Sequence, residues 1–167
     1  MSEVTLIGID LAKCVFQLHG ARSEGSVVFR KKLSRGQLLA FVAQQPKCLI
    51  AMEACATAHG WGREFEKLGH DVRLIPPVYV KPFVKRQKND VADAEAIVEA
   101  AMRPTMRFVA VKTEDQQARA MLFRTRQMFV GQRTQMINAL RGHLAERGLV
   151  AARGACSSQD VRARNCR

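Results

Sequence analysis

The first thirty residues alternate short apolar runs with turn signals, which is typical of β-strands. Residues 4–9 form a β-rich apolar run that ends at Asp10. Residues 14–19 alternate apolar and polar positions, and residues 26–31 follow a turn signal at residues 23–25. Three short strands with tight connections predict an antiparallel meander.

The next segment changes to a strand–helix–strand pattern. Apolar positions at helical spacing follow Ser34, a predicted N-cap. An apolar strand at residues 48–52 ends at Glu53, and a helix at residues 58–68 and a strand at residues 72–75 come after it. Such alternation implies parallel strands joined by right-handed crossovers. A meander followed by this section is the order of a ribonuclease-H-like domain. The expected fold is therefore α/β, a ribonuclease-H-like mixed sheet flanked by helices.

The second half of the chain is predominantly helical. One helix is predicted from residues 89–90 to about Met102, and only two tolerable glycines interrupt a helical pattern from Glu114 to Arg147. Two sets of apolar residues recur there every seven positions: Leu122, Phe129 and Met136, and Val130, Ile137 and Leu144. This repeat predicts one or two long helices with a coiled-coil-like seam.

These patterns divide the chain into three expected parts. Residues 1–112 form the sheet domain, and residues 113–148 form the helical segment. Residues 149–167 have no hydrophobic period and are expected to be a disordered or frameshifted tail.

The composition adds a strong positive charge. The chain holds 27 Lys and Arg against 15 Asp and Glu, a net charge of +12, and its isoelectric point is near 10.2. From Gln116 onward ten arginines stand against two carboxylates, so that stretch carries +8. Phosphate backbones are the commonest partner of such a chain, because each neutralised phosphate releases counterions. With 47% hydrophobic residues the chain can also bury a core.

The cysteines and the apolar runs of the sequence indicate in which cellular compartment the protein is expected. The five cysteines form no CxxC pair, and their odd number argues against a disulfide framework. No signal peptide opens the sequence, and no apolar run approaches the length of a membrane span. We therefore expect a cytoplasmic protein without a membrane partner.

Four carboxylates stand at the ends or beginnings of predicted elements. Asp10 and Glu53 each end an apolar strand, and these strand ends are neighbours in the expected sheet. Asp90 and Asp93 are three residues apart at a helix start and share a face. A carboxylate beside buried backbone is costly unless it is paired or bound to a metal ion. Four such groups at one sheet edge would hold hard cations through oxygen ligands.

Simpler interpretations exist for each carboxylate alone. Asp90 can cap the helix with Asp93 in its first turn, and Asp10 and Glu53 can end strands at turns. Trp61 is expected in the core rather than as a base-stacking platform. The four histidines have no metal-ligand spacing.

Three sequence blocks carry a specific resemblance. The blocks GIDLAK (residues 8–13), MEAC (52–55) and KNDVADA (88–94) resemble the signature blocks of the DEDD insertion-sequence transposases, the IS-one-ten group. The resemblance runs from about residue 4 to residue 150. It implies a RuvC-like domain in which Asp10, Glu53, Asp90 and Asp93 are catalytic and bind Mg²⁺, with Mn²⁺ as a substitute.

The resemblance also implies the partners. Members of this family are RNA-guided recombinases, so DNA and a structured guide RNA are expected, in a bacterial, nucleoid-associated protein. The helical segment is implied to mediate a homodimer or a higher oligomer. The expected nucleic-acid contacts are the basic residues after the fifth strand and the helical arginines: Lys81, Lys85, Arg86, Lys88, Arg119, Arg126 and Arg133.

A full-length member of the family continues into a second domain with a serine nucleophile, and no segment here matches that domain. We expect a transposase or recombinase in full-length form and a fragment that is inactive alone. One alternative is a catalytically incompetent, dimeric nucleic-acid-binding fragment. Another is an actin-like or sugar-kinase domain, which needs a glycine-containing phosphate loop after its first Asp. Leu11, Ala12 and Lys13 supply no such loop.

Overall fold

The computed structural model describes residues 4–84 and 90–150, with only the backbone at residues 90 and 91. The chain divides into two compact units, Met1–Thr113 and Glu114–Arg167. Among the described residues, no helix is both long and apolar enough to cross a membrane.

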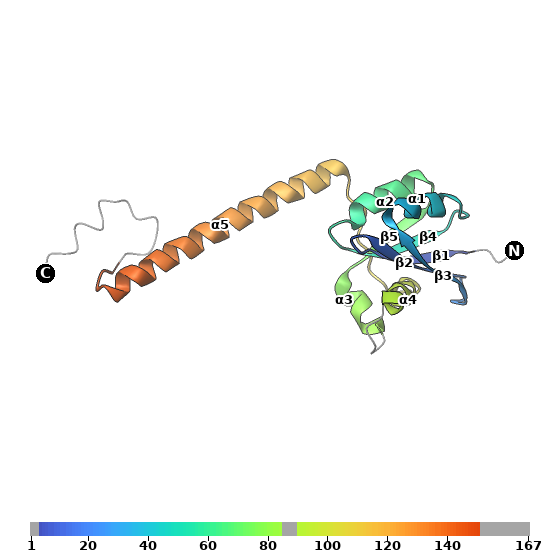
Figure 1. Cartoon of the computed structure of the whole chain (residues 1–167), viewed down its shortest axis with the longest axis horizontal. Helices are drawn as coiled ribbons and strands as arrows, with labels where there is room; N and C mark the ends of the chain where they lie inside the picture. Colours follow the sequence, from blue (N-terminus) through green and yellow to red (C-terminus); the bar gives the residue numbers. More distant parts are fainter. Residues whose placement is uncertain (1–3, 85–89, 151–167) are drawn as a thin grey trace. The chain divides into compact units, whose positions relative to one another are not determined.

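The first unit is built on one mixed sheet of five strands in the order β3-β2-β1-β4-β5 (Figure 1). The first three strands pair antiparallel, and β1, β4 and β5 pair parallel. This is the strand order of a ribonuclease-H-like sheet, and the predicted fold class is confirmed. The strands are β1 (Leu6–Asp10), β2 (Val15–Ala21), β3 (Val27–Ser34), β4 (Leu49–Glu53) and β5 (Asp71–Ile75).

Helices cover both faces of the sheet (Figure 1). Helices α1 (Arg35–Ala43) and α2 (Ala58–Lys67) lie on one face, and α4 (Asp90–Ala101) lies on the other. Each face has its own apolar cluster, because side chains along a strand alternate between faces. Ile7 and Ile9 of β1 pack in the cluster under α1 and α2, whereas Leu6 packs in the cluster under α4.

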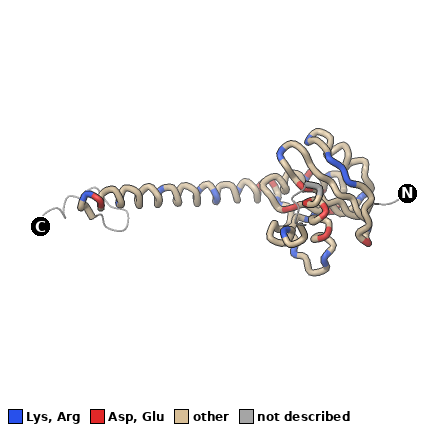
Figure 2. The backbone as a smooth tube through the Cα atoms, turned by 60° about the horizontal axis from the view of Figure 1, so that its bottom comes forward, with Lys and Arg blue, Asp and Glu red and all other residues tan. Residues whose placement is uncertain are grey.

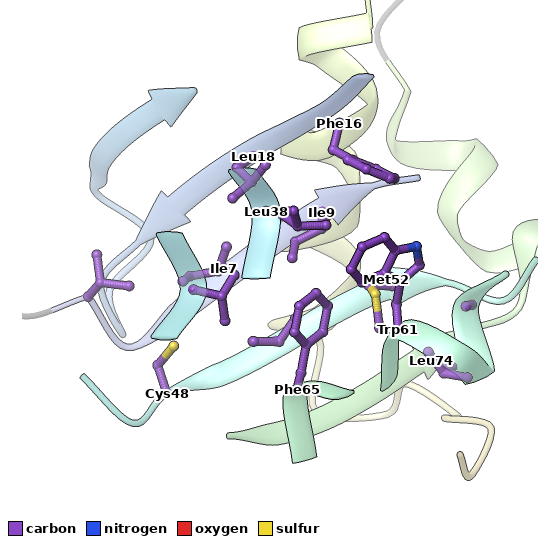
Figure 3. Close-up of a cluster of buried hydrophobic side chains, with 14 residues drawn as sticks. Ile7, Ile9, Phe16, Leu18, Leu38, Cys48, Met52, Trp61, Phe65 and Leu74 are labelled. Atoms are coloured by element: carbon purple, nitrogen blue, oxygen red, sulfur yellow. The ribbon is translucent and has the colours of Figure 1, made fainter. Parts of the chain in front are cut away.

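The larger cluster has an aromatic centre (Figure 3). Trp61 of α2 is 9% exposed, and its ring lies 5.3 Å from Phe16 and 5.8 Å from Phe65, centroid to centroid. Each fully buried side chain of this size stabilises the fold by roughly 1.5–3 kcal/mol. The prediction that Trp61 is a core residue is confirmed.

Local signals set the helix ends. Ser34 is the N-cap of α1, as predicted, and its backbone N–H donates to Oε1 of Gln37 at 3.0 Å, which is one half of a capping box. Gly69 has a φ of +89° directly after α2, where a residue without a Cβ adopts the left-handed conformation without strain.

Two short helices were not predicted from the sequence. After β5 the chain forms α3 (Pro77–Val80) and a 3₁₀ helix, η1 (Lys81–Phe83). Pro77 suits the first position of a helix, since the amide hydrogen it lacks has no partner there. Val109 forms one isolated bridge to β5, in which its N–H donates to the carbonyl of Leu74 at 2.8 Å.

The second unit contains one continuous helix of 33 residues, α5 (Glu114–Glu146). The predicted long helix is confirmed as a single element, and Gly131 and Gly142 do not break it. None of its residues is buried. The tail expected from residue 149 onward lies outside the described residues except for residues 149 and 150.

Candidate carboxylate site

The site begins with two neighbouring strand ends. Strands β1 and β4 pair in parallel, with Ile9 opposite Met52. Asp10 and Glu53 are the next residues along and the last of their strands. The expectation that these two strand ends are neighbours is confirmed, and both side chains are half-buried.

Both carboxylates share the face of the sheet that α4 covers. Gly8 and Ala51 are opposite one another in β1 and β4, two residues before Asp10 and Glu53. Ala51 packs in the cluster under α4. Because side chains two residues apart on a strand point to the same face, Asp10 and Glu53 also belong to the α4 face.

Gly8 allows α4 to pack directly on the backbone of β1. A Cβ at this position would lie 2.6 Å from the carbonyl oxygen of Ala94 and 2.6 Å from Cγ2 of Val98. Only glycine permits this approach. Gly8 belongs to the first sequence block, but its structural role was not predicted, although a glycine inside a strand signals close backbone approach.

Helix α4 places Asp93 next to this strand edge. The pKa of Glu53 is raised, first because burial disfavours its charged form and second because the negative charge of Asp93 repels it. Asp93 and Glu53 are therefore within electrostatic reach of one another, from elements 40 residues apart in the sequence. Asp90 is the first residue of α4, and its side chain lies outside the described residues.

The donor chemistry of this edge suits a hard divalent cation, since carboxylate oxygens are the ligands that such ions prefer. The raised pKa of Glu53 has the same implication, because two carboxylates held together repel each other until a cation or a proton neutralises them. Within the described part of the chain, which leaves out the Asp90 carboxylate, no three His, Cys, Asp or Glu side chains are grouped closely enough to hold a metal ion.

The predicted basic contacts lie on different elements. Lys81 is exposed on η1, where Phe83 lies 5.3 Å below the guanidinium of Arg103. Arg103 follows the C-terminal end of α4, whereas Asp90 and Asp93 are at its N-terminal end. Three further predicted contacts lie outside the described residues: Lys85, Arg86 and Lys88.

The helical arginines belong to the second unit. Arg119, Arg126 and Arg133 are exposed on α5 at intervals of seven residues. Along α5 the carboxylates stand only at the ends of the helix, at Glu114, Asp115 and Glu146, and the positions between them carry basic residues (Figure 2). The middle of α5 therefore presents positive charge alone.

Comparison with known families gives one match over most of the chain. The family model for DEDD insertion-sequence transposases, described as "Transposase", matches residues 7–147. The chain is 54% identical to a probable family 20 transposase of Pseudomonas aeruginosa over 151 residues, 90% of this chain and 45% of that protein. It is 49% identical to the transposase for insertion sequence element IS1328 of Yersinia enterocolitica over 154 residues, 92% of this chain and 46% of that protein.

A solved structure is also similar. The RuvC structure from Thermus thermophilus aligns with 62% of this chain and 99% of its own, at 16% identity and a TM-score of 0.47. The chain spans less than half the length of the curated relatives that it matches, between 40% and 46%.

Proposed function

This chain belongs to the DEDD family of insertion-sequence transposases, and from that premise we propose that it is the metal-binding, DNA-acting part of a transposase or recombinase. In this proposal Asp10, Glu53, Asp90 and Asp93 together hold Mg²⁺, for which Mn²⁺ substitutes. The whole protein would act in DNA transposition and recombination.

One observation carries the proposal. Glu53 is half-buried at the end of β4, beside the end of β1, and its pKa is raised by burial and by Asp93. Such an arrangement of carboxylates costs stability in a protein without a cation. Perturbed carboxylates of this kind are typical of functional sites.

The chemistry of the site follows from its ligands. Bound Mg²⁺ would polarise a phosphodiester and stabilise the charge on the attacking and leaving oxygens. Asp10 and Glu53 would orient the ion from the rigid sheet edge, and Asp90 and Asp93 from the first turn of α4. The contact between Gly8 and α4 would set the distance between these two pairs.

Nucleic-acid partners are supported by charge. We propose that Lys81, Lys85, Arg86 and Lys88, with the arginines of α5, contact phosphates of DNA and of a structured guide RNA. The net charge of +12 favours such partners. A protein with these partners would work at the bacterial nucleoid.

A second copy of this chain is the proposed partner of α5. Leu122 and Phe129 are 72% and 61% exposed, and Met136, seven residues further, is 66% exposed. A single helix with apolar residues at heptad spacing buries them when it pairs with a second helix of the same kind. We propose a homodimer or higher oligomer through this segment.

DNA cleavage tests the proposal. Labelled duplex and branched DNA would be incubated with the purified chain in Mg²⁺ and in EDTA, beside Asp10→Asn. If the chain cuts DNA by itself, the cutting should require Mg²⁺ and should fall about a hundredfold or more in Asp10→Asn, because the substitution removes one ligand charge. Exposed Asp71→Asn is the control. Cutting that persists in Asp10→Asn would contradict the role of this residue.

A second candidate function is DNA binding without cutting. It is favoured by the length of the relatives, more than half of which lies beyond the matched part. In that case the chain should bind DNA more tightly in Mg²⁺ and less tightly at high salt, and no cleavage product should form in either Mg²⁺ or EDTA. Isothermal titration with Mn²⁺ tests for the metal site itself. Cutting and binding without cutting both require an ion that the wild type binds and Asp10→Asn does not. If neither protein binds Mn²⁺, the chain has no metal site.

A further inference from the structure

A row of polar residues crosses the sheet from the carboxylates to β3. Asp10 of β1 is opposite Gln17 of β2, and Gln17 is opposite Lys32 of β3. Glu53 continues the row on the other side of Asp10. Neighbouring strands are about 4.8 Å apart, so the backbone of Lys32 lies roughly 10 Å from that of Asp10.

The side-chain contacts of β3 identify the face on which Lys32 lies. Arg30 forms an ion pair with Glu95 of α4 at 3.1 Å, so residues 30 and 32 belong to the α4 face. Lys31 points to the opposite face, where its ammonium lies 4.5 Å from the centroid of the Phe41 ring. Lys32 therefore shares a face with Asp10 and Glu53, and Lys31 does not.

Helix α4 covers the preceding row of the sheet. That row contains Arg30, His19 and Gly8, which are opposite one another across β3, β2 and β1. Glu95 holds Arg30, and Ala94 and Val98 lie against Gly8. One row further on, Lys32 is exposed and Gln17 is half-buried.

We propose that Lys32 and Gln17 contact the phosphate backbone of the DNA strand that enters the carboxylate site, so that the DNA crosses the β2–β3 side of the sheet. The inference rests on the proposed function, since it needs DNA at the carboxylates. The phosphates of a DNA strand that approaches Asp10 and Glu53 are repelled by these carboxylates. The positive charge of Lys32 in the same row offsets this repulsion. Exposed Lys13, in the loop after β1, adds a second positive charge to this edge.

The test compares two adjacent lysines of one strand. Binding of a fluorescein-labelled DNA duplex to the full chain would be measured by anisotropy over a range of salt concentrations in Mg²⁺. Lys32→Gln and Lys31→Gln each remove one charge, from opposite faces. We expect Lys32→Gln to weaken binding roughly three- to tenfold near 0.1 M salt and to lower the slope of log K against log salt by about 0.9. Lys31→Gln should change neither quantity, and Lys32→Arg should restore both.

The outcomes separate this inference from the proposed function. If Lys32→Gln and Lys31→Gln weaken DNA binding equally, the inference is wrong and the proposed function still stands. The same holds for a weakening confined to a labelled RNA of the same sequence. If the wild-type chain does not bind the duplex at all, the proposed function fails, and the inference fails with it. Matching thermal unfolding curves for the variants ensure that binding, not folding, is compared.

Discussion

A glycine in the middle of β1 sets the distance between α4 and the sheet. The Cβ of an alanine at Gly8 would meet the backbone oxygen of Ala94 at 2.6 Å, and backbone cannot move aside as a flexible side chain can. The position of Asp93, one residue before Ala94, depends on this contact. A glycine therefore sets where Asp93 lies relative to Glu53.

We predict that Gly8→Ala destabilises the chain by about 1–3 kcal/mol, the usual cost of overpacking a core. Thermal or urea unfolding measures it. Gly60→Ala in α2 is the matched control, because a Cβ there meets nothing within 4 Å. An alanine at this helical position should be neutral or stabilise by up to about 1 kcal/mol. If Gly8→Ala is as stable as the wild type, α4 can shift away from β1 and the contact does not fix its position.

Glu53 makes stability depend on pH. Its pKa in the folded chain is raised above the ordinary value of 4.5. Its contribution to stability is therefore fully present below pH 4.5 and is lost as the pH rises through the folded pKa. The Glu53→Gln variant has an uncharged side chain at this position at every pH, so its stability lacks this pH dependence.

Without divalent metal, we expect Glu53→Gln to unfold at a higher temperature than the wild type at about pH 7. The difference should shrink as the pH falls toward the ordinary pKa of 4.5. Added Mg²⁺ should raise the unfolding temperature of the wild type more than that of the variant. Differential scanning calorimetry with and without EDTA measures both effects. Glu66→Gln, an exposed position on α2, serves as the control. A variant less stable than the wild type in EDTA would show that the charge on Glu53 does not cost stability.

At the scale of elements, α5 differs from every helix that covers the sheet of the first unit. The helices α1, α2 and α4 each bury apolar residues against the sheet, whereas α5 buries none. Isolated helices gain little stability from propensity alone, so most of their stability comes from packing of an apolar face. The apolar heptad residues of α5 are exposed, and the proposed pairing with a second copy of the chain would bury them.

We predict that Phe129→Glu weakens self-association of the chain at least about tenfold, because a carboxylate in an apolar helix interface is costly. Sedimentation equilibrium measures the dissociation constant. Gln135→Glu adds the same charge to α5 away from the apolar heptad positions and should leave association unchanged. A wild-type chain that is monomeric at high concentration would contradict the proposed dimer.

At the scale of the whole molecule, the two units hold different properties. Both apolar clusters consist of residues before Thr113, so the core belongs to the first unit. Residues 114–167 hold ten arginines against four carboxylates, half of the net charge of +12. The three described carboxylates of the site therefore lie in the first unit, and half of the net positive charge lies in the second.

A chain that ends at Thr113 should fold, with a free energy of unfolding within about 0.5 kcal/mol of the first unit in the full chain, because it keeps every core residue. Its DNA affinity should fall more than about tenfold, and the salt dependence should flatten by about 0.9 for each phosphate that is no longer neutralised. Circular dichroism and anisotropy measure the two properties. Failure to fold would show that the first unit needs α5.

Many elements of this protein could be predicted from local sequence patterns. Hydrophobic periodicity is local, and it correctly predicted the five strands, the helices α1, α2 and α4, the length of α5 and the order of the sheet. The ends of β1 and β4 at Asp10 and Glu53 could be predicted for the same reason, since each carboxylate directly follows an apolar run. The short helix α3 and η1 were missed, because four residues are too few to show a period.

The residues that meet across the sheet could not be predicted in this way and depend on how the chain folds. The approach of α4 to Gly8 and the row from Asp10 to Lys32 join residues far apart in the sequence. Strand register and helix packing determine such contacts, and a shift of one residue would turn Lys32 to the other face. Lys31 and Lys32 look equivalent in the sequence, but the pleat of β3 places them on opposite faces of the sheet.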